Sequence, residues 1–374
     1  MEDDNQRMEV VEMAGTGRVR VGILGQGRSG RDIHAEWLCR CPEKYTIAAV
    51  SDLLRDRRDR AVREFGCDAY ADYKDVLARE DVDLVVNALP SHLHAQSTVE
   101  AFRAGRHVVC EKPVAASTGD FRRMVAASRR SGRILAPFQQ SRYAPHFQQI
   151  RRVIDSGVLG RIVQIRIAFN GFARRWDWQT LQEFKGGNLL NTGPHPMDQA
   201  LCLLEWKKPA VQCIMDRTNT YGDAEDHVKV LLRRKGSPTI DLEISSCDAW
   251  SGDMYHVCGT RGGLAGGADG VRWRFYDPGA SPKQRLTRTP LPGPSYCREE
   301  LAWTEESWAP DEAEKDAFTY MSRAFYDHLY RVLEDGEPLY ITPEQVAVQV
   351  AVMEECHRQN PLSRRKPRGW KNGS

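Results

Sequence analysis

The chain has 374 residues, a length that favours two domains, and 41% of them are hydrophobic and 28% charged, a composition typical of a globular protein. No apolar stretch approaches the roughly 20 residues of a membrane-spanning helix, and 53 basic against 51 acidic residues provide no strong field for a nucleic acid, so we expect neither partner. The ten cysteines are scattered, which favours reduced thiols over disulfides or a metal site.

The first part of the chain is predicted to form a doubly wound α/β domain over residues 18–140. A leader, residues 1–17, carries acids where a signal peptide carries basic residues, and we interpret it as the disordered start of a cytoplasmic protein. Short β-branched runs then alternate with amphipathic segments, the pattern of right-handed crossovers on a parallel sheet. The expected strands are 18–24, 45–51, 83–88, 107–110 and 133–136, and the expected helices are 55–65, 95–104 and 119–131.

The second part, residues 141–360, has a different rhythm and is predicted to be an α+β domain. One helix is expected near 146–156, and the strands that follow it without intervening helices indicate an antiparallel or mixed sheet. These strands are 162–170, 211–218, 227–233 and 239–246. Residues 260–310 are rich in glycine and proline and are predicted as loops and short strands. Two late helices are expected, at 312–333 and from Thr342-Pro343-Glu344, before a basic flexible tail, 361–374.

A glycine-rich turn follows the first predicted strand and opens a helical pattern. Its sequence is Gly25-Gln26-Gly27-Arg28-Ser29-Gly30. In a dinucleotide-binding turn the first glycine permits the tight bend, the second lets the backbone approach a pyrophosphate, and the third allows the helix to pack closely on the strand. Asp52 ends the next strand, 22 residues beyond Gly30, at the spacing of an acid that binds the adenosine ribose. The pattern therefore predicts a dinucleotide site on this domain.

Asp52 also bears on which dinucleotide is bound. Its carboxylate can accept hydrogen bonds from both ribose hydroxyls and would repel a 2′-phosphate, which favours NAD. Arg55, Arg57 and Arg58 follow closely and could embrace that phosphate, although arginines on an exposed helix face are more often simply solvated. We therefore expect NAD as the cofactor, with NADP as the alternative.

Three further elements are more specific than the glycine turn. His34 lies four residues after Gly30, Glu111-Lys112-Pro113 closes a predicted strand, and a longer run contains His195. That run is Gly186-Gly187-Asn188-Leu189-Leu190-Asn191-Thr192-Gly193-Pro194-His195-Pro196-Met197-Asp198. Together these motifs resemble the Gfo/Idh/MocA family, named for glucose-fructose oxidoreductase and inositol dehydrogenase, over about residues 18–359.

The resemblance implies an architecture. A Rossmann domain comes first, and a second domain follows with an open, mostly antiparallel sheet whose face meets the nicotinamide. That sheet often makes oligomer contacts in the family, so we expect a homo-oligomer, either a dimer or a tetramer.

The resemblance assigns catalytic roles to Lys112 and His195. In the family this lysine lies beside the nicotinamide and the reacting hydroxyl, and this histidine serves as the general acid/base. The assignment suits the chemistry, because oxidising a secondary alcohol requires a base for the hydroxyl proton and a cation near the developing alkoxide. The plainer interpretations are a surface lysine before a turn proline and a histidine that only caps a helix. Asn191 stands where many members have an aspartate, so it can position a catalytic group but cannot carry a proton.

The resemblance also extends the cofactor site to the loop after the strand at 83–88. Leu89, Pro90 and His94 match a segment that lines the cofactor in the family, although a packed helix residue is the plainer interpretation of His94. The expected cofactor-binding residues are Gly25, Gln26, Gly27, Arg28, Ser29, Gly30, Asp52, Leu89, Pro90, His94, Glu111 and Lys112.

Five side chains are candidates for substrate binding. Asp198 shares a helix face with His195 and could orient the imidazole, bind a substrate hydroxyl, or only complement the helix dipole. Gln140 and Arg142 match a family segment at the domain junction, where they could reach the nicotinamide or substrate, or brace the hinge. Trp176 and Trp178 have faces suited to sugar rings, but their spacing also fits one face of a strand that packs on the core.

Three functional hypotheses follow. The leading one is an NAD(P)-dependent oxidoreductase that transfers a hydride between the nicotinamide and a secondary hydroxyl of a sugar, sugar derivative or cyclic polyol. The second is an enzyme for redox-assisted elimination or glycoside cleavage that recycles its NAD, because sites and not folds decide reactions. The third is a catalytically silent NAD-sensing regulatory protein, against which Lys112 and His195 speak and for which Asn191 speaks mildly.

Overall fold

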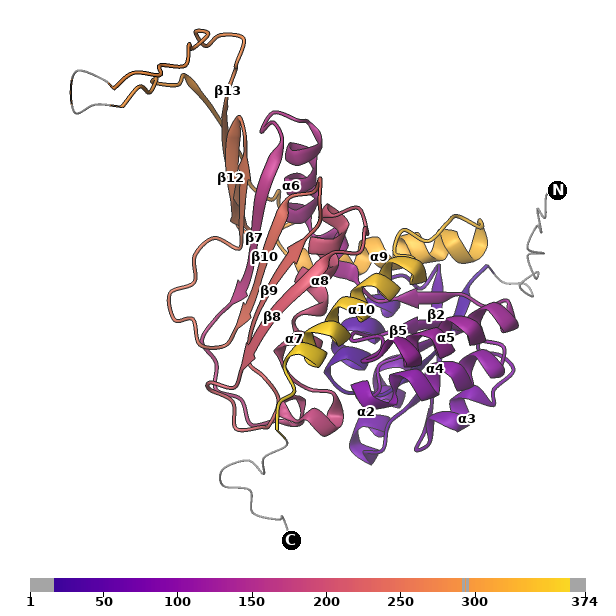
Figure 1. Ribbon diagram of the computed structural model, residues 1–374. Helices are drawn as coiled ribbons and strands as arrows, with labels where there is room; N and C mark the ends of the chain where they lie inside the picture. The colour runs from indigo at the N-terminus through magenta and orange to yellow at the C-terminus, as the bar shows by residue number, and fades with distance from the viewer. Residues whose placement is uncertain (1–16, 291–292, 294–295, 364–374) are drawn as a thin grey trace, which may run out of the picture.

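The computed structural model describes residues 17–290, 293 and 296–363, which form two units built on sheets (Figure 1). The leader and tail expected from the sequence lie almost wholly outside the described residues. The first unit has a six-stranded parallel sheet in the order β3-β2-β1-β4-β5-β6. Its strands are β1 (Val19–Leu24), β2 (Tyr45–Ser51), β3 (Asp68–Tyr70), β4 (Leu84–Asn87), β5 (His107–Cys110) and β6 (Leu135–Pro137).

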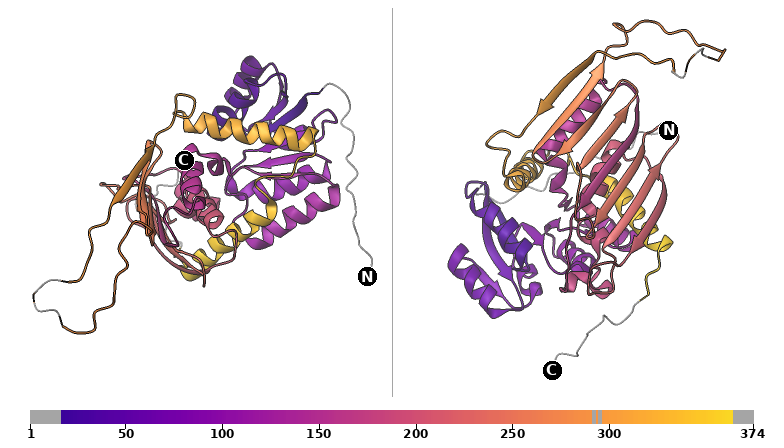
Figure 2. Two further views of the ribbon diagram at one scale, coloured as in Figure 1. Left: turned by 90° about the horizontal axis from the view of Figure 1, so that it is seen from above. Right: turned by 90° about the vertical axis from the view of Figure 1, so that its left-hand side faces the viewer.

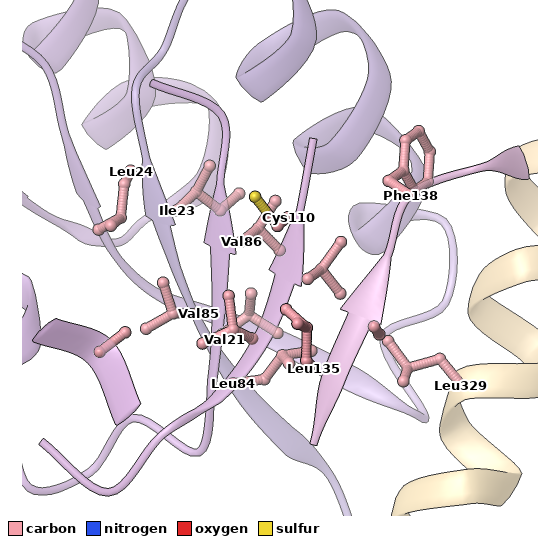
Figure 3. Packing of buried hydrophobic residues seen from close by; sticks show 14 of the residues in the cluster. Val21, Ile23, Leu24, Leu84, Val85, Val86, Cys110, Leu135, Phe138 and Leu329 are labelled. Atoms are coloured by element: carbon pink, nitrogen blue, oxygen red, sulfur yellow. The ribbon is translucent and has the colours of Figure 1, made fainter. Parts of the chain in front are cut away.

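The strand order of the first sheet reverses between β1 and β4, which makes the doubly wound fold expected from the sequence. Both strands are almost wholly buried and nearly all apolar, because helices cover the two faces of such a sheet. Figure 3 shows Val21 and Ile23 of β1 packed with Leu84 and Val86 of β4. Ligands of doubly wound sheets bind at the carboxyl ends of the strands where the order reverses, so the loops after β1 and β4 are the expected site.

Helices connect these strands. They are η1 (Ser29–Ala35) and α1 (Glu36–Cys39), which follow one another directly, then α2 (Arg55–Phe65), α3 (Tyr73–Leu77), α4 (His94–Arg103) and α5 (Thr118–Ser131). The predicted strands and helices of this unit are confirmed, with β2 and α2 ending at the predicted residues. The short elements β3 and α3 were not predicted, because three residues with Asp68 exposed at the sheet edge are too few for a periodic signal.

The second unit has an eight-stranded sheet in the order β14-β13-β12-β11-β7-β10-β9-β8, which Figure 2 shows in two further views. All neighbouring strands are antiparallel except the parallel pair β7 and β10. The strands are β7 (Ile162–Asn170), β8 (Ala210–Asp216), β9 (His227–Arg233), β10 (Thr239–Ser245), β11 (Tyr255–Gly259), β12 (Gly262–Gly267), β13 (Gly270–Tyr276) and β14 (Trp303–Trp308). Helices α6 (Pro145–Asp155) and α8 (Pro194–Leu203) pack against it and share its core. The open, mostly antiparallel sheet is thereby confirmed.

The prediction of loops and short strands over 260–310 agrees with the structure, but it gave no positions for the strands. The structure has β12, β13 and β14 there, paired in register as a regular antiparallel extension of the sheet. The apolar alternation that reveals a strand is interrupted, because β12 carries four glycines and β14 is exposed along nearly its whole length. Between β13 and β14 the chain makes a long projecting loop (Figure 1).

The last two helices return to the first unit. Helix α9 (Ala317–Glu334) contributes Phe325, Tyr326 and Leu329 to the core around the parallel sheet. Helix α10 (Pro343–Gln359) contributes Val346 to that core and Met353 to the core of the second unit. Thr342 caps α10, as a threonine before a proline predicts. The structure adds a reciprocal hydrogen bond, from the Thr342 backbone N–H to the Gln345 side chain. Helix α10 therefore ties the two cores together.

The end of α10 closes one edge of the eight-stranded sheet. The side-chain amide of Gln359 accepts from the Cys213 backbone N–H (2.8 Å) and donates to the Val211 carbonyl (2.8 Å). Asn360 does the same for the Met215 N–H (3.1 Å) and the Cys213 carbonyl (3.0 Å). Four backbone groups on the outer edge of β8 are thus paired by side chains instead of by another strand.

Within the described ranges, no helix has the length and apolar composition needed to cross a bilayer, and no group of His, Cys, Asp or Glu side chains is arranged to hold a metal ion. All ten cysteines are free thiols.

Candidate active site

The glycine turn has a geometry that only glycine allows. Gly25 has φ of +90°, and a Cβ there would lie 2.6 Å from the Ala88 carbonyl oxygen. A Cβ on Gly30 would lie 1.8 Å from the Gly25 carbonyl oxygen, so the helical segment packs directly on the turn. At Gly27 the nearest atom to a Cβ is an Arg57 nitrogen at 3.6 Å, which leaves the backbone open for a pyrophosphate. The turn fits a dinucleotide.

Asp52 lies beside this turn. Its Oδ2 accepts from the Gln26 backbone N–H (2.8 Å) and lies 3.3 Å from a guanidinium nitrogen of Arg57, and its Oδ1 accepts from the Leu54 N–H (2.9 Å). The acid expected to bind ribose thus stands next to an arginine that is half exposed. The side-chain oxygen of Gln26 is buried without a partner among the described residues, which leaves an acceptor free at the turn.

Lys112 reaches from the first unit to the second. It follows β5 and precedes a cis bond to Pro113. Its ammonium donates to the backbone carbonyl of Asn191 (3.0 Å) and lies 3.5 Å from the Asn191 side-chain oxygen. Asn191 ends α7 (Asn188–Asn191), one turn before α8. Burial lowers the pKa of Lys112, and the charge of Glu111 opposes this.

Glu111 is held by a chain of buried groups. Its Oε2 accepts from the Lys112 backbone N–H (2.9 Å), and its Oε1 lies 3.1 Å from Nε2 of His34. Nδ1 of His34 lies 2.6 Å from the hydroxyl of Tyr326 on α9. Burial raises the pKa of Glu111, but the hydrogen bond from His34 and the nearby charge of Lys112 bring it down to about 2. The carboxylate beside Lys112 is therefore ionised and fixed in place.

His195 stands in the first turn of α8, directly after Pro194. Its Nδ1 lies 3.2 Å from the hydroxyl of Ser141. Burial, together with the charge of Lys112, lowers the pKa of His195 to about 3. The imidazole is consequently neutral near neutral pH and able to accept a proton.

Asp198 and Arg142 engage each other instead of reaching the imidazole. The guanidinium of Arg142 donates to both carboxylate oxygens of Asp198 (2.9 and 2.8 Å), and neither residue is more than 1% exposed. Arg142 also donates to the Tyr340 carbonyl (2.9 Å) and to the Gln345 side chain (2.5 Å). The pair braces α8 against the start of α10, so the position of His195 is set by this pair and by Ser141.

Two other residues expected at the site, His94 and Gln140, are buried. His94 is buried, with one ring nitrogen 2.8 Å from the Pro113 carbonyl oxygen and the other 2.7 Å from the Leu89 carbonyl oxygen, so it joins the loop of Leu89 and Pro90 to the Lys112-Pro113 turn. Gln140, next to Ser141, is also buried, and its side-chain oxygen has no partner among the described residues.

The two tryptophans lie on the segment after β7. Trp176 is 78% exposed and Trp178 is 42% exposed. The Trp178 ring meets Phe184 edge-on at 6.1 Å between centroids, and Phe184 lies 5.3 Å from the ring of His92 in the loop after β4. Aromatic contacts therefore link this segment of the second unit to the expected cofactor loop of the first.

Comparison with known proteins gives the same division of the chain. Residues 19–139 match the model of the oxidoreductase family with an NAD-binding Rossmann fold, and residues 147–265 match the GFO/IDH/MocA C-terminal domain. The chain belongs to the Gfo/Idh/MocA family. It is thus a member of a family of NAD-dependent oxidoreductases and carries that family's NAD-binding domain.

Three curated enzymes are among the proteins similar to this chain. It is 30% identical over 199 residues to D-glucoside 3-dehydrogenase of Escherichia coli, covering 52% of this chain and 56% of that protein. It is 28% identical over 170 residues to inositol 2-dehydrogenase of Salmonella typhimurium, covering 45% and 48%. It is 25% identical over 253 residues to 2,7-anhydro-N-acetylneuraminate hydratase of Mediterraneibacter gnavus, covering 66% of each. The chain thus spans between about half and two thirds of the length of these relatives.

Solved structures agree with the family fold over nearly the whole chain. The oxidoreductase YvaA of Bacillus subtilis has a TM-score of 0.76 at 19% identity and covers 94% of this chain and 98% of its own. Levoglucosan dehydrogenase in complex with NADH and levoglucosan has a TM-score of 0.74 at 16% identity, with coverage of 92% and 97%. At such identities the likeness concerns the fold.

Sequence reasoning did not find three residues that take part in this site of the family fold. Tyr326 meets His34 across 292 positions of the chain, and Ser141 meets His195 across 54. Glu225, buried next to α7, is the third. Tyr326 and Glu225 stand in no motif named above, and Ser141 stands between Gln140 and Arg142 of a family segment without a role of its own there, so the tertiary structure reveals their contacts.

Proposed function

We propose that this chain is a dehydrogenase that uses NAD to oxidise a secondary hydroxyl of a sugar, sugar derivative or cyclic polyol to a ketone, or NADH to reduce that ketone in the reverse direction. The observation that carries the proposal is the hydrogen bond from the Lys112 ammonium to the Asn191 carbonyl (3.0 Å). It brings a cation from the cofactor-binding unit to the segment that leads into His195. An ammonium and a neutral imidazole near one another are the two groups that alcohol oxidation needs.

The roles of the side chains follow from their states. The neutral imidazole of His195 accepts the hydroxyl proton as the alcohol is oxidised, and returns it in the reverse direction. The Lys112 ammonium stabilises the negative charge that develops on that oxygen. When bound, the nicotinamide supplies the acceptor or donor of the hydride. Asn191 accepts a hydrogen bond from Lys112 but takes up no proton, so it positions the ammonium.

Two features support NAD and a carbohydrate-like substrate. Asp52 stands at the turn with one oxygen on the Gln26 backbone N–H, where its charge disfavours a 2′-phosphate, although Arg57 beside it keeps NADP as the alternative. Two relatives are named as dehydrogenases of a D-glucoside and of inositol, which are ring compounds, and the exposed Trp176 and Trp178 suit contact with such a ring.

The test is a panel of sugars, glycosides and inositols with NAD and with NADP, monitored at the absorbance of reduced nicotinamide. We expect stoichiometric NADH formation with at least one compound, and a loss of kcat/KM of ~1,000-fold in Lys112→Met with cofactor affinity retained. Lys315→Met, at an exposed lysine of the chain, is the matched control and should leave kcat/KM unchanged. No turnover across the panel, or an active Lys112→Met, would contradict the proposal.

A redox-neutral reaction is the second candidate, because one relative is named a hydratase. In such a reaction the substrate is oxidised, undergoes elimination or addition, and is reduced again by the same cofactor. The panel distinguishes the two, since product would then form without net NADH.

A further inference from the structure

A carboxyl group outside the motifs discussed so far lies against the start of α7. Glu225 precedes β9 and is 2% exposed. Its Oε1 accepts from the backbone N–H of Leu189 (3.1 Å), and its backbone carbonyl accepts from the N–H of Asn188 (2.9 Å). Glu225 thus pairs two of the N–H groups that the first turn of a helix leaves without partners.

The chain makes room for this carboxyl group. Gly187 has φ of +104°, and a Cβ there would lie 2.3 Å from Oε1 of Glu225. Only glycine therefore allows Glu225 to reach the start of α7. The carbonyl of Gly187 accepts from the N–H of Asn191 (2.9 Å), and the carbonyl of Asn191 accepts from the Lys112 ammonium (3.0 Å).

We propose that Glu225 is a positioning residue for the reaction proposed above: its carboxyl group fixes the start of α7 and thereby holds Asn191 against the Lys112 ammonium. The inference rests on the proposed function for its consequence on catalysis. The connection runs through one short helix: hydrogen bonds join Glu225 to Leu189 and Asn191 to Lys112, and the backbone of α7 joins Leu189 to Asn191.

The neighbouring acid has a different task and supplies the control. The carboxylate of Asp226 accepts from the backbone N–H groups of Thr218, Asn219 and Thr220 (2.6 to 2.7 Å), which holds that turn and not α7. An Asp226→Asn variant therefore perturbs a similar buried carboxylate in the same loop without loosening the side-chain contact to α7.

The groups that face Glu225 are few. Nε2 of His357 on α10 lies 3.9 Å from Oε1, and Asp226 is the next residue in the chain. Arg175 and Glu225 both line one small cavity. Burial, with a smaller contribution from Asp226, raises the pKa of Glu225 to about 7, and burial lowers the pKa of His357. The protonated carboxyl group keeps a carbonyl oxygen for the Leu189 N–H, so Glu225→Gln imitates that state.

The first experiment measures the start of α7 directly by hydrogen exchange. In Glu225→Ala we expect the Leu189 amide to exchange at least about tenfold faster, whereas Glu225→Gln and Asp226→Asn keep wild-type protection. In the wild type we expect protection at Leu189 to change between about pH 6 and about pH 8, and in Glu225→Gln to stay constant. This second comparison decides the question even where the alanine variant does not fold. Wild-type protection in a folded Glu225→Ala, or equal pH dependence in both chains, would overturn the inference.

The second experiment follows Lys112. Labelling with acetic anhydride over a range of pH, read by peptide mass spectrometry, gives the apparent pKa of its amine without any substrate. We expect this pKa to fall in Glu225→Ala, which loses the fixed carbonyl acceptor, and to be restored in Glu225→Gln. With a turned-over substrate, kcat should fall about tenfold in Glu225→Ala and recover in Glu225→Gln, while the Kd for NAD stays within about twofold.

The two proposals fail separately. An unchanged Lys112 labelling curve in Glu225→Ala overturns the role of Glu225 and leaves the proposed reaction standing. A wild-type chain without turnover on any substrate contradicts the proposed reaction, and the labelling curve alone then decides whether Glu225 holds Lys112.

Discussion

The two side chains proposed to act on the substrate are held in different ways. Hydrogen bonds join the Lys112 backbone N–H to Glu111, Glu111 to His34, and His34 to Tyr326. This line of hydrogen bonds involves three separate elements of the fold. His195 stands on a helix that one fully buried ion pair, Arg142 with Asp198, holds in place. A line of hydrogen bonds can be weakened one member at a time. Removing one partner of a buried ion pair leaves an uncompensated charge, so we expect the loss of either partner to destabilise the whole region around His195.

The largest effect is expected on the His195 side. Arg142→Met leaves the Asp198 carboxylate buried without a partner, and we expect a loss of about 3–5 kcal/mol in the free energy of unfolding. Urea denaturation followed by circular dichroism measures it. Arg272→Met is the control, because Arg272 pairs with Asp253 while 68% exposed, and such a surface pair contributes at most about 1 kcal/mol. Similar losses of stability in Arg142→Met and Arg272→Met would show that the buried ion pair contributes no more than a surface pair.

Glu225 is a third buried carboxyl group, after Glu111 and Asp198, and its ionisation should lower the stability of the folded chain. The pKa of Glu225 is about 7 in the folded chain against an ordinary 4.5, so the carboxyl ionises in the unfolded chain first. The wild type therefore loses stability as the pH rises from about 5 to about 7, and Glu225→Gln removes this loss. The difference of 7 − 4.5 = 2.5 pKa units corresponds to on the order of 3 kcal/mol.

Urea denaturation of both chains at several values between about pH 5 and about pH 8 tests this. We expect the stability of Glu225→Gln relative to the wild type to increase with pH and then level off. Glu344→Gln, at a carboxylate of α10 whose side chain is 66% exposed, is the control. A constant difference between Glu225→Gln and the wild type would mean that Glu225 ionises as it does in water.

The smallest of the three effects is expected on the Lys112 side. Tyr326→Phe removes the hydroxyl 2.6 Å from Nδ1 of His34 and leaves that nitrogen buried without its partner. We expect a loss of about 1–2 kcal/mol in the free energy of unfolding. Tyr296→Phe, at a tyrosine that is 88% exposed, should stay within about 0.5 kcal/mol of the wild type. A loss of stability in Tyr326→Phe as large as that in Arg142→Met would contradict the expected difference between the Lys112 side and the His195 side.

The residues proposed to act on the substrate could be predicted from the sequence, whereas the groups that hold them could not. The glycine turn could be recognised because each of its glycines has a physical role in binding a dinucleotide, and Lys112 and His195 stand in short motifs that resemble those of the family. The parallel sheet was predictable from its buried strands, which are mainly apolar, such as residues 84–86 of β4.

The groups that hold these residues were not predictable. The contact of His34 with Tyr326 spans 292 positions, and no pattern of neighbouring residues records it. Asp198 shares a helix face with His195, and orienting the imidazole was one of three interpretations. Helix periodicity gives only a direction and not the partner, and the partner is Arg142. The positions of β12 to β14 could not be predicted, because glycines and exposed polar residues hide their alternation.

The pairing of the β8 edge by Gln359 and Asn360 has a consequence for the newly made polypeptide. Until these two residues leave the ribosome, the outer edge of β8 has no amides to cover it, although every strand of its sheet has already been synthesised. An uncovered edge is a template for a strand of another molecule. Chains cut just before Gln359 should therefore associate edge to edge, which places protection against misassembly in the final turn of α10.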